Sequence, residues 1–349
     1  MRSQNANQLT RRGLLAAGGA TALGAFLAAC GSSGSKSGSA GAAPSGAARS
    51  GPWSFTDDQP KKLSAPRTPK RIVAFTGTAA ALVDLGLDQQ IVGVFGETET
   101  ADGTADPQAG DVDVNKVTII GNAYGEFDVE KYAALQPDLM VTHMYDPGAF
   151  WYVPNESKDK IFKVNPNVAA ITVARVPITQ PIEHYANLAA SLGADLNARK
   201  VTDAKARFEA ASDAVCSAVK AAGGIRVLAC SASADLFYAS NPEISTDLMY
   251  FAQLGVDIVV PNKLDGGGYY ESLSWENADK YPADLLLLDD RSTALQPKDL
   301  TGKPTWAQLP AVKANQITPW SSVPRFSHAG VAPLLEQLAK AIQAAKKVS

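Results

Sequence analysis

A sequence pattern that occurs twice limits the fold of this chain more than any other feature. Residues 82–95 contain Leu-Val-Asp-Leu-Gly-Leu-Asp ahead of a short apolar run, and residues 251–260 contain Phe-Ala-Gln-Leu-Gly-Val-Asp ahead of another. Further along each half, at 130–142 and 276–288, a helical pattern leads into Asp-Leu and one more apolar run. Short apolar runs that alternate with helical patterns indicate parallel strands in α/β units. The sequence therefore predicts two α/β lobes of similar plan.

Apolar runs mark the predicted strands of each lobe. They lie at 71–75, 91–95, 117–120, 139–142 and 171–174 in the first lobe, and at 225–230, 236–239, 256–260, 284–288 and 316–318 in the second. Between the lobes, small and apolar residues recur every three or four positions over 195–222, which predicts one long helix with Asp195 as its N-cap. At about 1.5 Å per residue this helix is roughly 42 Å long, enough to join both lobes. Because a helix resists bending, we expect the lobes to move by only a few degrees.

The N-terminal residues predict export and a lipid anchor. Residues 1–29 contain twin arginines, Arg11 and Arg12, and an apolar stretch that ends in Leu-Ala-Ala ahead of Cys30. Small residues before a cysteine at the end of an export signal are typical of a lipoprotein processing site. We therefore expect a twin-arginine signal peptide over 1–29 and a lipid on Cys30, which would hold the protein at the outer face of the cell membrane. The alternative is an ordinary signal peptide with an incidental cysteine.

The tract that follows the cysteine is rich in Gly, Ser and Ala. Residues 30–52 have too few apolar side chains to fold, and we interpret them as a flexible tether. The rest of the chain then divides into an N-terminal lobe over 53–194, a linker helix over 195–222 and a C-terminal lobe over 223–349.

Charge and cysteine content exclude several classes of protein. The chain has 32 Lys and Arg against 35 Asp and Glu, a net charge of −3, which favours neither a nucleic-acid partner nor a polybasic membrane contact. Cys216 and Cys230 fall on the linker helix and on the strand after it, about 10 and 20 Å from the turn between these elements. A disulfide requires Cα atoms within about 7 Å, so we expect two buried free thiols.

Further landmarks occur in a fixed order along the chain. They are Arg71-Ile-Val-Ala-Phe, the Leu-Gly-Leu-Asp turn, Glu130 to Leu139, and Trp306 to Lys313. With two lobes joined by a long helix, these landmarks make residues 70–345 similar to the substrate-binding proteins of ABC importers in the helical-backbone class, such as actinobacterial ferric-hydroxamate-binding lipoproteins and the cobalamin-binding protein. The resemblance implies two Rossmann-like α/β lobes with a ligand cleft between them, a monomer without enzymatic activity, and a membrane permease as partner.

The class includes binding proteins for ferric siderophores, cobalamin, haem and bare metal ions. His143, His184 and His328 are the histidines of this chain, and their spacing gives no pair of metal ligands, so we interpret His184 and His328 as structural. Aromatic and Arg side chains instead gather near the ends of predicted strands, where ligands bind in parallel sheets. The candidate ligand-binding residues are Tyr124, Tyr145, Trp151, Tyr152, Phe237, Tyr238, Tyr269, Tyr270, Trp275, Arg291, Trp320 and Arg325.

Few basic residues accompany these rings. A ferric triscatecholate carries about three negative charges and requires several cations, whereas a ferric trishydroxamate is nearly neutral. The composition therefore favours capture of a ferric hydroxamate such as a ferrioxamine, with the iron held by the siderophore and no cofactor or protein metal ligand. Cobalamin or haem binding and a ligand-sensing surface lipoprotein are the alternatives. The motifs of serine hydrolases, phosphate-loop enzymes and zinc proteases do not occur, which disfavours a surface hydrolase.

The same resemblance implies that one acidic residue of each lobe docks on permease arginines. By motif these residues are Glu130 and Glu243. The alternative is that each carboxylate only stabilises the N-terminus of a helix, by about 0.3–1 kcal/mol.

Overall fold

In the computed structural model, which describes residues 51–59 and 61–349, the apolar runs of the first half form a five-stranded parallel sheet. Its strands are β3 (Ile72–Phe75), β4 (Ile91–Phe95), β5 (Thr118–Gly121), β6 (Leu139–Met144) and β7 (Val168–Thr172), in the order β5-β4-β3-β6-β7. The central strands are buried throughout, because helices cover both faces of the sheet. The carboxyl ends of all five strands therefore meet at one edge.

The helices of this N-terminal lobe alternate with its strands. They are α1 (Thr76–Asp84), α2 (Val129–Ala134), α3 (Lys158–Val164) and α4 (Thr179–Ser191), with single 3-10 turns at η1 (Asp88–Gln90) and η2 (Pro107–Ala109). An antiparallel hairpin that the sequence did not predict, β1 (Trp53–Thr56) and β2 (Lys62–Ala65), precedes them. The indole of Trp53 donates a hydrogen bond to Ser191 of α4, at 3.0 Å, and thereby ties the hairpin to the lobe.

The C-terminal lobe contains a mixed sheet. Its strands are β8 (Arg226–Ala232), β9 (Leu236–Ser240), β10 (Asp257–Ile258), β11 (Tyr270–Ser274), β12 (Leu285–Asp289) and β13 (Ile317–Trp320). The main order is β11-β9-β8-β12-β13, and β10 pairs with β8. The expectation of parallel strands is wrong for β9, which is antiparallel to β8, and the strand β11 is in turn antiparallel to β9. Only Ser233–Asp235 separate β8 from β9, too few residues for a parallel crossover, and β11 was not predicted at all.

Helices of the C-terminal half complete the fold. They are α6 (Thr246–Gln253), η3 (Trp275–Asn277), α7 (Pro304–Gln308), α8 (Pro310–Lys313) and α9 (His328–Ala344). The predicted linker helix is α5 (Arg199–Ala222), and Gly223 ends it in the left-handed conformation. The prediction that Asp195 is its N-cap is wrong. The Asp195 side chain instead accepts a hydrogen bond from the backbone of Asn197 in the turn before the helix, and Ala198 occupies the cap position.

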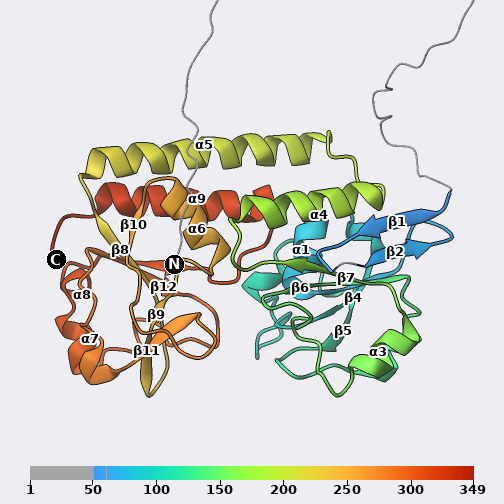
Figure 1. Ribbon diagram of the computed structural model, residues 1–349, viewed down its shortest axis with the longest axis horizontal. Coiled ribbons are helices and arrows are strands. Elements are labelled where there is room, and N and C mark those ends of the chain that lie inside the picture. The colour runs from blue at the N-terminus through green and yellow to red at the C-terminus, as the bar shows by residue number, and fades with distance from the viewer. Residues whose placement is uncertain (1–50, 60) are drawn as a thin grey trace, which may run out of the picture. The chain divides into compact units, whose positions relative to one another are not determined.

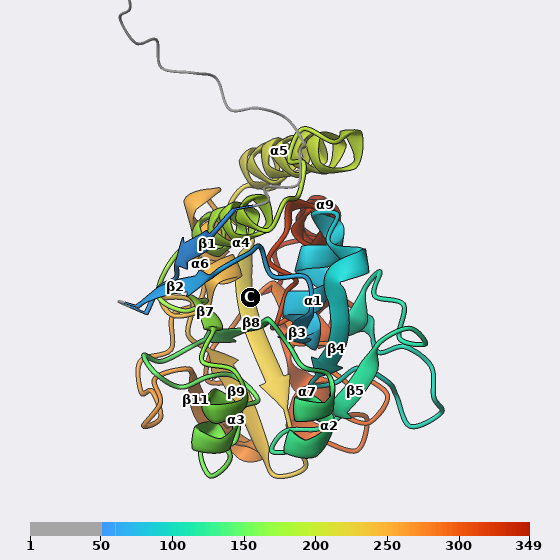
Figure 2. The ribbon, with the colours of Figure 1, turned by 90° about the vertical axis from the view of Figure 1, so that its right-hand side faces the viewer.

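The long helix α5 runs above both sheets, with α9 and α4 beneath it (Figure 1). Seen from the N-terminal lobe, α5 and α9 lie at one end and α2 and α3 at the other (Figure 2). The prediction of two Rossmann-like lobes joined by one long helix is confirmed. Among the described residues, none of the helices has both the length and the apolar character that crossing a bilayer requires. The predicted signal peptide over 1–29 and lipid site at Cys30 lie outside the described residues, as does the tether except for Gly51 and Pro52.

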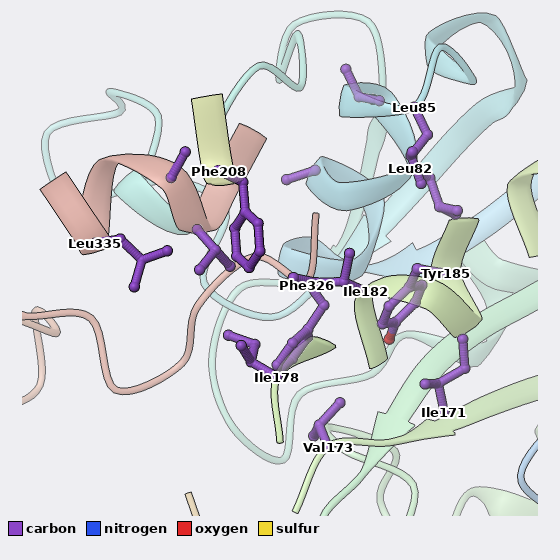
Figure 3. Packing of buried hydrophobic residues seen from close by; sticks show 14 of the residues in the cluster. Leu82, Leu85, Ile171, Val173, Ile178, Ile182, Tyr185, Phe208, Phe326 and Leu335 are labelled. Atoms are coloured by element: carbon purple, nitrogen blue, oxygen red, sulfur yellow. The ribbon is translucent and has the colours of Figure 1, made fainter. Parts of the chain in front are cut away.

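One hydrophobic core extends through both lobes beneath α5. Phe208 of α5, Tyr185 of α4, Leu335 of α9 and Phe326 are all at most 5% exposed and belong to it (Figure 3). The rings of Tyr185 and Phe326 stack at 6.1 Å between centroids. Because the helices that join the lobes share this core with both sheets, a wide swing of one lobe would expose apolar surface.

Each sheet also has a core of its own on the face away from α5. In the N-terminal lobe it contains Phe75, Phe95 and Ile161, and in the C-terminal lobe it contains Phe237 and Trp306. The two cysteines are free thiols, as predicted. The prediction that the thiols are buried is confirmed for Cys230. Cys216 is only half-buried, since it lies outside the buried face of α5.

Candidate ligand-binding site

A cavity of about 570 Å³ lies between the two sheets, a size typical of small-molecule sites. Four segments that follow strands contribute most of its lining. These are residues 145–156 after β6, 244–247 at the start of α6, 291 after β12, and 320–326 at the end of β13 and beyond. Parallel strands bring their carboxyl ends to one edge, which is why side chains from distant parts of the sequence meet here.

The segment after β6 folds back onto its own strand. The backbone N–H of Trp151 donates to the carbonyl of His143 at 2.9 Å, and Thr142 Oγ1 donates to the carbonyl of Trp151 at 2.9 Å. Tyr152 then adopts a φ of 60°, in the left-handed region that costs a bulky residue free energy. Its hydroxyl donates to Glu97. Strained residues held by such contacts are common at ligand sites, since the surrounding structure fixes them in place.

Aromatic rings form a continuous wall on this side of the cavity. Trp151 lies 4.6 Å from Tyr145, 5.3 Å from Tyr152 and 6.0 Å from Tyr124, measured between ring centroids. Tyr124 is 73% exposed and forms the outer end of this wall. Rings at these separations attract one another edge to face, so the wall is ordered without hydrogen bonds between them.

The opposite side of the cavity carries a cation, Arg291. Its guanidinium binds Asp289, with Nη2 at 2.6 Å from Oδ2, and Ser231 and Ser322 donate to the same carboxylate. Burial alone would raise the pKa of Asp289, but the hydrogen bonds and charge of Arg291 hold it below its ordinary value. The arginine charge is therefore largely neutralised before any ligand arrives.

A second acid lies in the first turn of α6. Asp247 is 1% exposed, and its carboxylate accepts a hydrogen bond from Trp320 Nε1 at 2.6 Å. Burial raises the pKa of Asp247 to about 6, although the hydrogen bond from Trp320 acts in the opposite direction. Both residues line the cavity.

Three residues connect the lobes at the cavity wall. Tyr269 of the C-terminal lobe donates its hydroxyl to Asp146 of the N-terminal lobe at 2.9 Å. Arg175 pairs with Asp146 at 3.0 Å and lies over the Tyr269 ring, 5.7 Å from its centroid. Burial and the hydrogen bond to Asp146 raise the pKa of Tyr269 to about 12, so the phenol stays protonated and keeps donating at neutral pH.

The other phenols of the cavity also stay protonated. Burial raises the pKa of Tyr145, Tyr152 and Tyr270 above the ordinary tyrosine value. A neutral phenol donates hydrogen bonds to oxygen atoms but is a poor ligand for a bare metal ion, which binds the phenolate. The cavity is therefore suited to an apolar ligand with accessible oxygens.

Most of the predicted ligand-binding residues line this one cavity. They are Tyr124, Tyr145, Trp151, Tyr152, Tyr269, Tyr270, Arg291 and Trp320. Their contact with a ligand stays a prediction.

The structure places four predicted residues elsewhere; two of them lie on β9, and a third, Trp275, begins η3 after β11. Successive side chains of β9 point to opposite faces of the sheet, and that of Phe237 points into the C-terminal core, where it is fully buried. Trp275 packs on Phe237 at 5.9 Å and donates to the carbonyl of Ala234 at 3.1 Å. Tyr238 lies on the other face, with its ring 5.8 Å from that of Tyr270, and is not part of the lining.

Arg325, the fourth, binds the N-terminal lobe instead of facing the cavity. Its guanidinium lies 3.5 Å from the Asp84 carboxylate, which also accepts a hydrogen bond from Ser327 at 2.5 Å. Gly110 makes room for it, since a Cβ at that position would collide with the arginine side chain. The ion pair thus ties the segment after β13 to α1.

Sequence reasoning missed several lining residues. Ile244, Ser245, Thr246 and Asp247 follow β9, a predicted strand whose antiparallel direction the sequence did not indicate. Asp247 also resembles an ordinary acidic residue in a first helical turn, so its type and position gave no signal of a buried role.

The histidines have separate environments. His184 pairs with Asp58 at 2.8 Å, and His328 packs on the Phe208 ring at 5.1 Å, while Ser327 caps α9. His143 is fully buried among the rings of Phe75, Tyr145, Trp151 and Phe326, and neither ring nitrogen has a hydrogen-bond partner. Across residues 51–59 and 61–349, no three or more His, Cys, Asp or Glu side chains are grouped so as to hold a metal ion.

The two predicted docking residues are both exposed. Glu130 lies in the first turn of α2, as predicted. Glu243 was expected at a helix start, but it lies in the turn before α6, where its N–H donates to Asn241 Oδ1 at 3.0 Å. The next residue, Ile244, lines the cavity, whereas Glu243 itself does not.

Comparison with known proteins identifies the family. Residues 72–324 match the sequence profile described as periplasmic binding protein, and the chain belongs to this family. It is therefore an extracytoplasmic substrate-binding protein and not an enzyme, as predicted.

Solved structures agree with this assignment. DesE, a ferric-siderophore receptor protein from Streptomyces coelicolor, is 51% identical over 85% of this chain and 100% of its own, with a TM-score of 0.81. The petrobactin-binding protein YclQ from Bacillus subtilis, at 18% identity and a TM-score of 0.62, covers 84% of this chain and 99% of its own. The siderophore-binding protein from the fuscachelin gene cluster of Thermobifida fusca is also 18% identical, with a TM-score of 0.55, and covers 80% and 98%. No curated protein matches the chain.

Proposed function

We propose that this protein captures a ferric hydroxamate siderophore outside the cell membrane and delivers it to an ABC importer. The observation that carries the proposal is the cavity between the lobes, which combines an aromatic wall with neutral phenol donors and an arginine already neutralised by Asp289. The similarity to DesE, whose description is that of a ferric-siderophore receptor, supports the same class of ligand.

The charge of the cavity favours a hydroxamate over a catecholate. A triscatecholate would bring about three negative charges into a site where the lining cation Arg291 and the adjacent Arg175 are each paired with a carboxylate. A nearly neutral trishydroxamate avoids this cost, while its apolar arms can pack on Trp151 and Tyr145 and its oxygens can accept from phenols. The iron would remain in its own oxygen shell, without a ligand from the protein.

Uptake of radioactive iron tests capture and delivery together. Cells that lack this chain should accumulate iron from a ferric trishydroxamate slowly, and the wild-type gene should restore uptake. The same cells should take up iron from a ferric catecholate at a rate that does not depend on the gene. Equal uptake of the hydroxamate with and without the gene would contradict the proposal.

Anchoring is a separate part of the proposal. Cys30→Ala should yield a folded protein that is released or unprocessed, because the acylated thiol is missing. Mass spectrometry of the membrane-bound mature protein checks this. An unmodified Cys30 in that fraction would overturn the lipoprotein interpretation.

We further propose that Glu130 and Glu243 dock on permease arginines, where charge pairs steer association and fix its register. The double variant Glu130→Ala/Glu243→Ala should lose uptake more than either single change. Because Ile244 lines the cavity, ligand affinity of the purified double variant must be measured alongside. Unchanged uptake would exclude both residues from docking.

The fold offers a second candidate for the docking residue of the C-terminal lobe, Glu276, which can be compared with Glu243. Glu276 is exposed and lies nine residues before the first residue of β12, and Glu130 lies nine residues before the first residue of β6. Both strands pair with the first strand of their sheet. If Glu130→Ala/Glu276→Ala abolishes uptake while Glu130→Ala/Glu243→Ala does not, the C-terminal contact belongs to Glu276 and not to Glu243.

A further inference from the structure

Asp247 is a buried carboxylate that faces the ligand cavity. It is 1% exposed, lines the cavity, and accepts its side-chain hydrogen bond from a neutral donor, the Trp320 indole. Among the residues that the structure describes, no Lys, Arg or His forms an ion pair with it. Buried charges in proteins are ordinarily paired, so this carboxylate lacks the partner that its position calls for.

The remaining charges of the cavity do not supply that partner. Arg291 binds Asp289 at 2.6 Å, and Arg175 binds Asp146 at 3.0 Å. Glu156, an exposed residue of the lining, adds a further negative charge and has no ion-pair partner among the described residues. The cavity as a whole is therefore acidic once its internal pairs are counted.

The energetic cost of this arrangement is visible at Asp247. Burial raises its pKa to about 6, even though the start of α6 and the Trp320 N–H both favour the ionised form. With a pKa of about 6, Asp247 is ionised in most molecules at neutral pH. A positive group placed beside it would relieve the cost.

We propose that Asp247 receives a cationic arm of the ligand, so that the cavity selects ferric trishydroxamates that end in a primary ammonium. This inference rests on the proposed function and narrows its ligand class. A single carboxylate offers too few oxygens to hold a metal ion, whereas one ammonium donor satisfies it with a charge-assisted hydrogen bond. The phenols of Tyr145 and Tyr270 line the same cavity and can accept the remaining ammonium hydrogens.

Matched ligands test the proposal on the wild-type protein. The ferric complex of a linear trishydroxamate with a free terminal ammonium is compared with its N-acetyl and N-succinyl derivatives, which are neutral and anionic at the same position. The ammonium complex should bind at least about tenfold more tightly than the acetyl complex, as expected for a buried charge-assisted hydrogen bond. The succinyl complex should bind most weakly.

Variants assign the preference to one residue. Asp247→Asn keeps the shape of the side chain and should reduce the preference for ammonium over acetyl to less than about twofold, mainly by weakening the ammonium complex. Asp213→Asn, which changes an exposed carboxylate on α5, should keep the full preference. If Asp247→Asn does not fold, the ligand comparison on the wild type still decides the matter.

Proton release gives an independent readout. Near pH 6 the ammonium complex should expel protons from Asp247, measured by calorimetry in buffers of different ionisation enthalpy, and the acetyl complex should expel none. The pKa values of Tyr145, Tyr269, Tyr270 and Arg291 are raised above their ordinary values and that of Asp289 is lowered, so these groups do not exchange protons near pH 6. Asp146 and Glu156 also line the cavity, and the acetyl complex is the control for any proton that they exchange.

The outcomes separate this inference from the proposed function. Equal affinity for the ammonium and acetyl complexes, or equal losses for both in Asp247→Asn, would overturn the role of Asp247 and leave siderophore capture standing. Failure of every complex to bind would overturn the proposed function itself.

Discussion

Buried polar side chains at the cavity differ in how much their type and position in the sequence reveal. His143 lies near the end of the buried strand β6 and contacts four aromatic rings, yet neither of its nitrogens has a hydrogen-bond partner. Asp247 lines the cavity and has no ion-pair partner among the described residues. The aromatic residues were predictable because strand ends in parallel sheets converge, but burial without a partner depends on contacts that only the folded chain creates.

His143 makes stability sensitive to acid. Burial lowers its pKa to about 3, against 6.5 in an unfolded chain, so the unfolded state takes up the proton first as the pH falls. Its contribution to stability is intact above pH 6.5 and declines by up to about 1.4 kcal/mol per pH unit below it. Asp247 acts in the opposite direction, since its raised pKa favours protonation of the folded state between about pH 6 and 4.

The two effects are separated with His143→Phe, which cannot titrate. Urea unfolding at pH 7, 6 and 5 should show that the variant loses less stability than the wild type as the pH falls, so that the difference between their free energies of unfolding shifts in favour of the variant. Parallel pH dependence of the two proteins would mean that His143 is not held neutral by burial.

Position 110 needs a glycine for two reasons, its positive φ and the close approach of the Arg325 side chain. It has a φ of 53°, and a Cβ would collide with Arg325. Gly103 provides a matched control, because its φ is 79° but nothing lies within 4 Å of an added Cβ. Gly103→Ala should cost about 1 kcal/mol of stability, and Gly110→Ala should cost at least about 1 kcal/mol more, measured by urea unfolding. Equal losses would show that Arg325 moves aside freely.

At the scale of elements, the repeat and the helical pattern located most of the fold. The parallel strands β3, β4, β6 and β12 lie within a few residues of the predicted runs, because buried parallel strands are continuous apolar segments. The edge strand β11 contains Glu271 and alternates in polarity, so no apolar run indicated it. The β8–β9 hairpin was misread for a related reason, since an apolar run does not show its direction.

The pairing of α5 with α9 predicts an unequal distribution of stability. Phe208→Ala should cost about 3–5 kcal/mol, because it removes a ring from the core that both lobes share. Glu336→Gln breaks an exposed pair with Arg207 across the same helices and should cost less than about 1 kcal/mol. Thermal unfolding measures both, and a small loss for Phe208→Ala would mean that the shared core does not hold the helices together.

At the scale of the whole molecule, the order of landmarks indicated the family and the two-lobe plan, and both are confirmed. The residues that cross from lobe to lobe were not predictable. Arg325 with Asp84, and Tyr269 with Asp146, join segments far apart in sequence whose meeting depends on how the two sheets pack. Each lobe could be inferred from its own pattern, whereas the contacts between lobes have no pattern in the chain.

The titration of tryptophan fluorescence with a panel of chelates tests the central claim most directly. Trp151 and Trp320 line the cavity, so a ligand held there should quench their emission. The account predicts submicromolar binding of a ferric trishydroxamate, on the order of −8 kcal/mol or better, and far weaker binding of ferric catecholates, haem and cobalamin. Tight binding of a bare divalent cation with no response to any ferric chelate would contradict it.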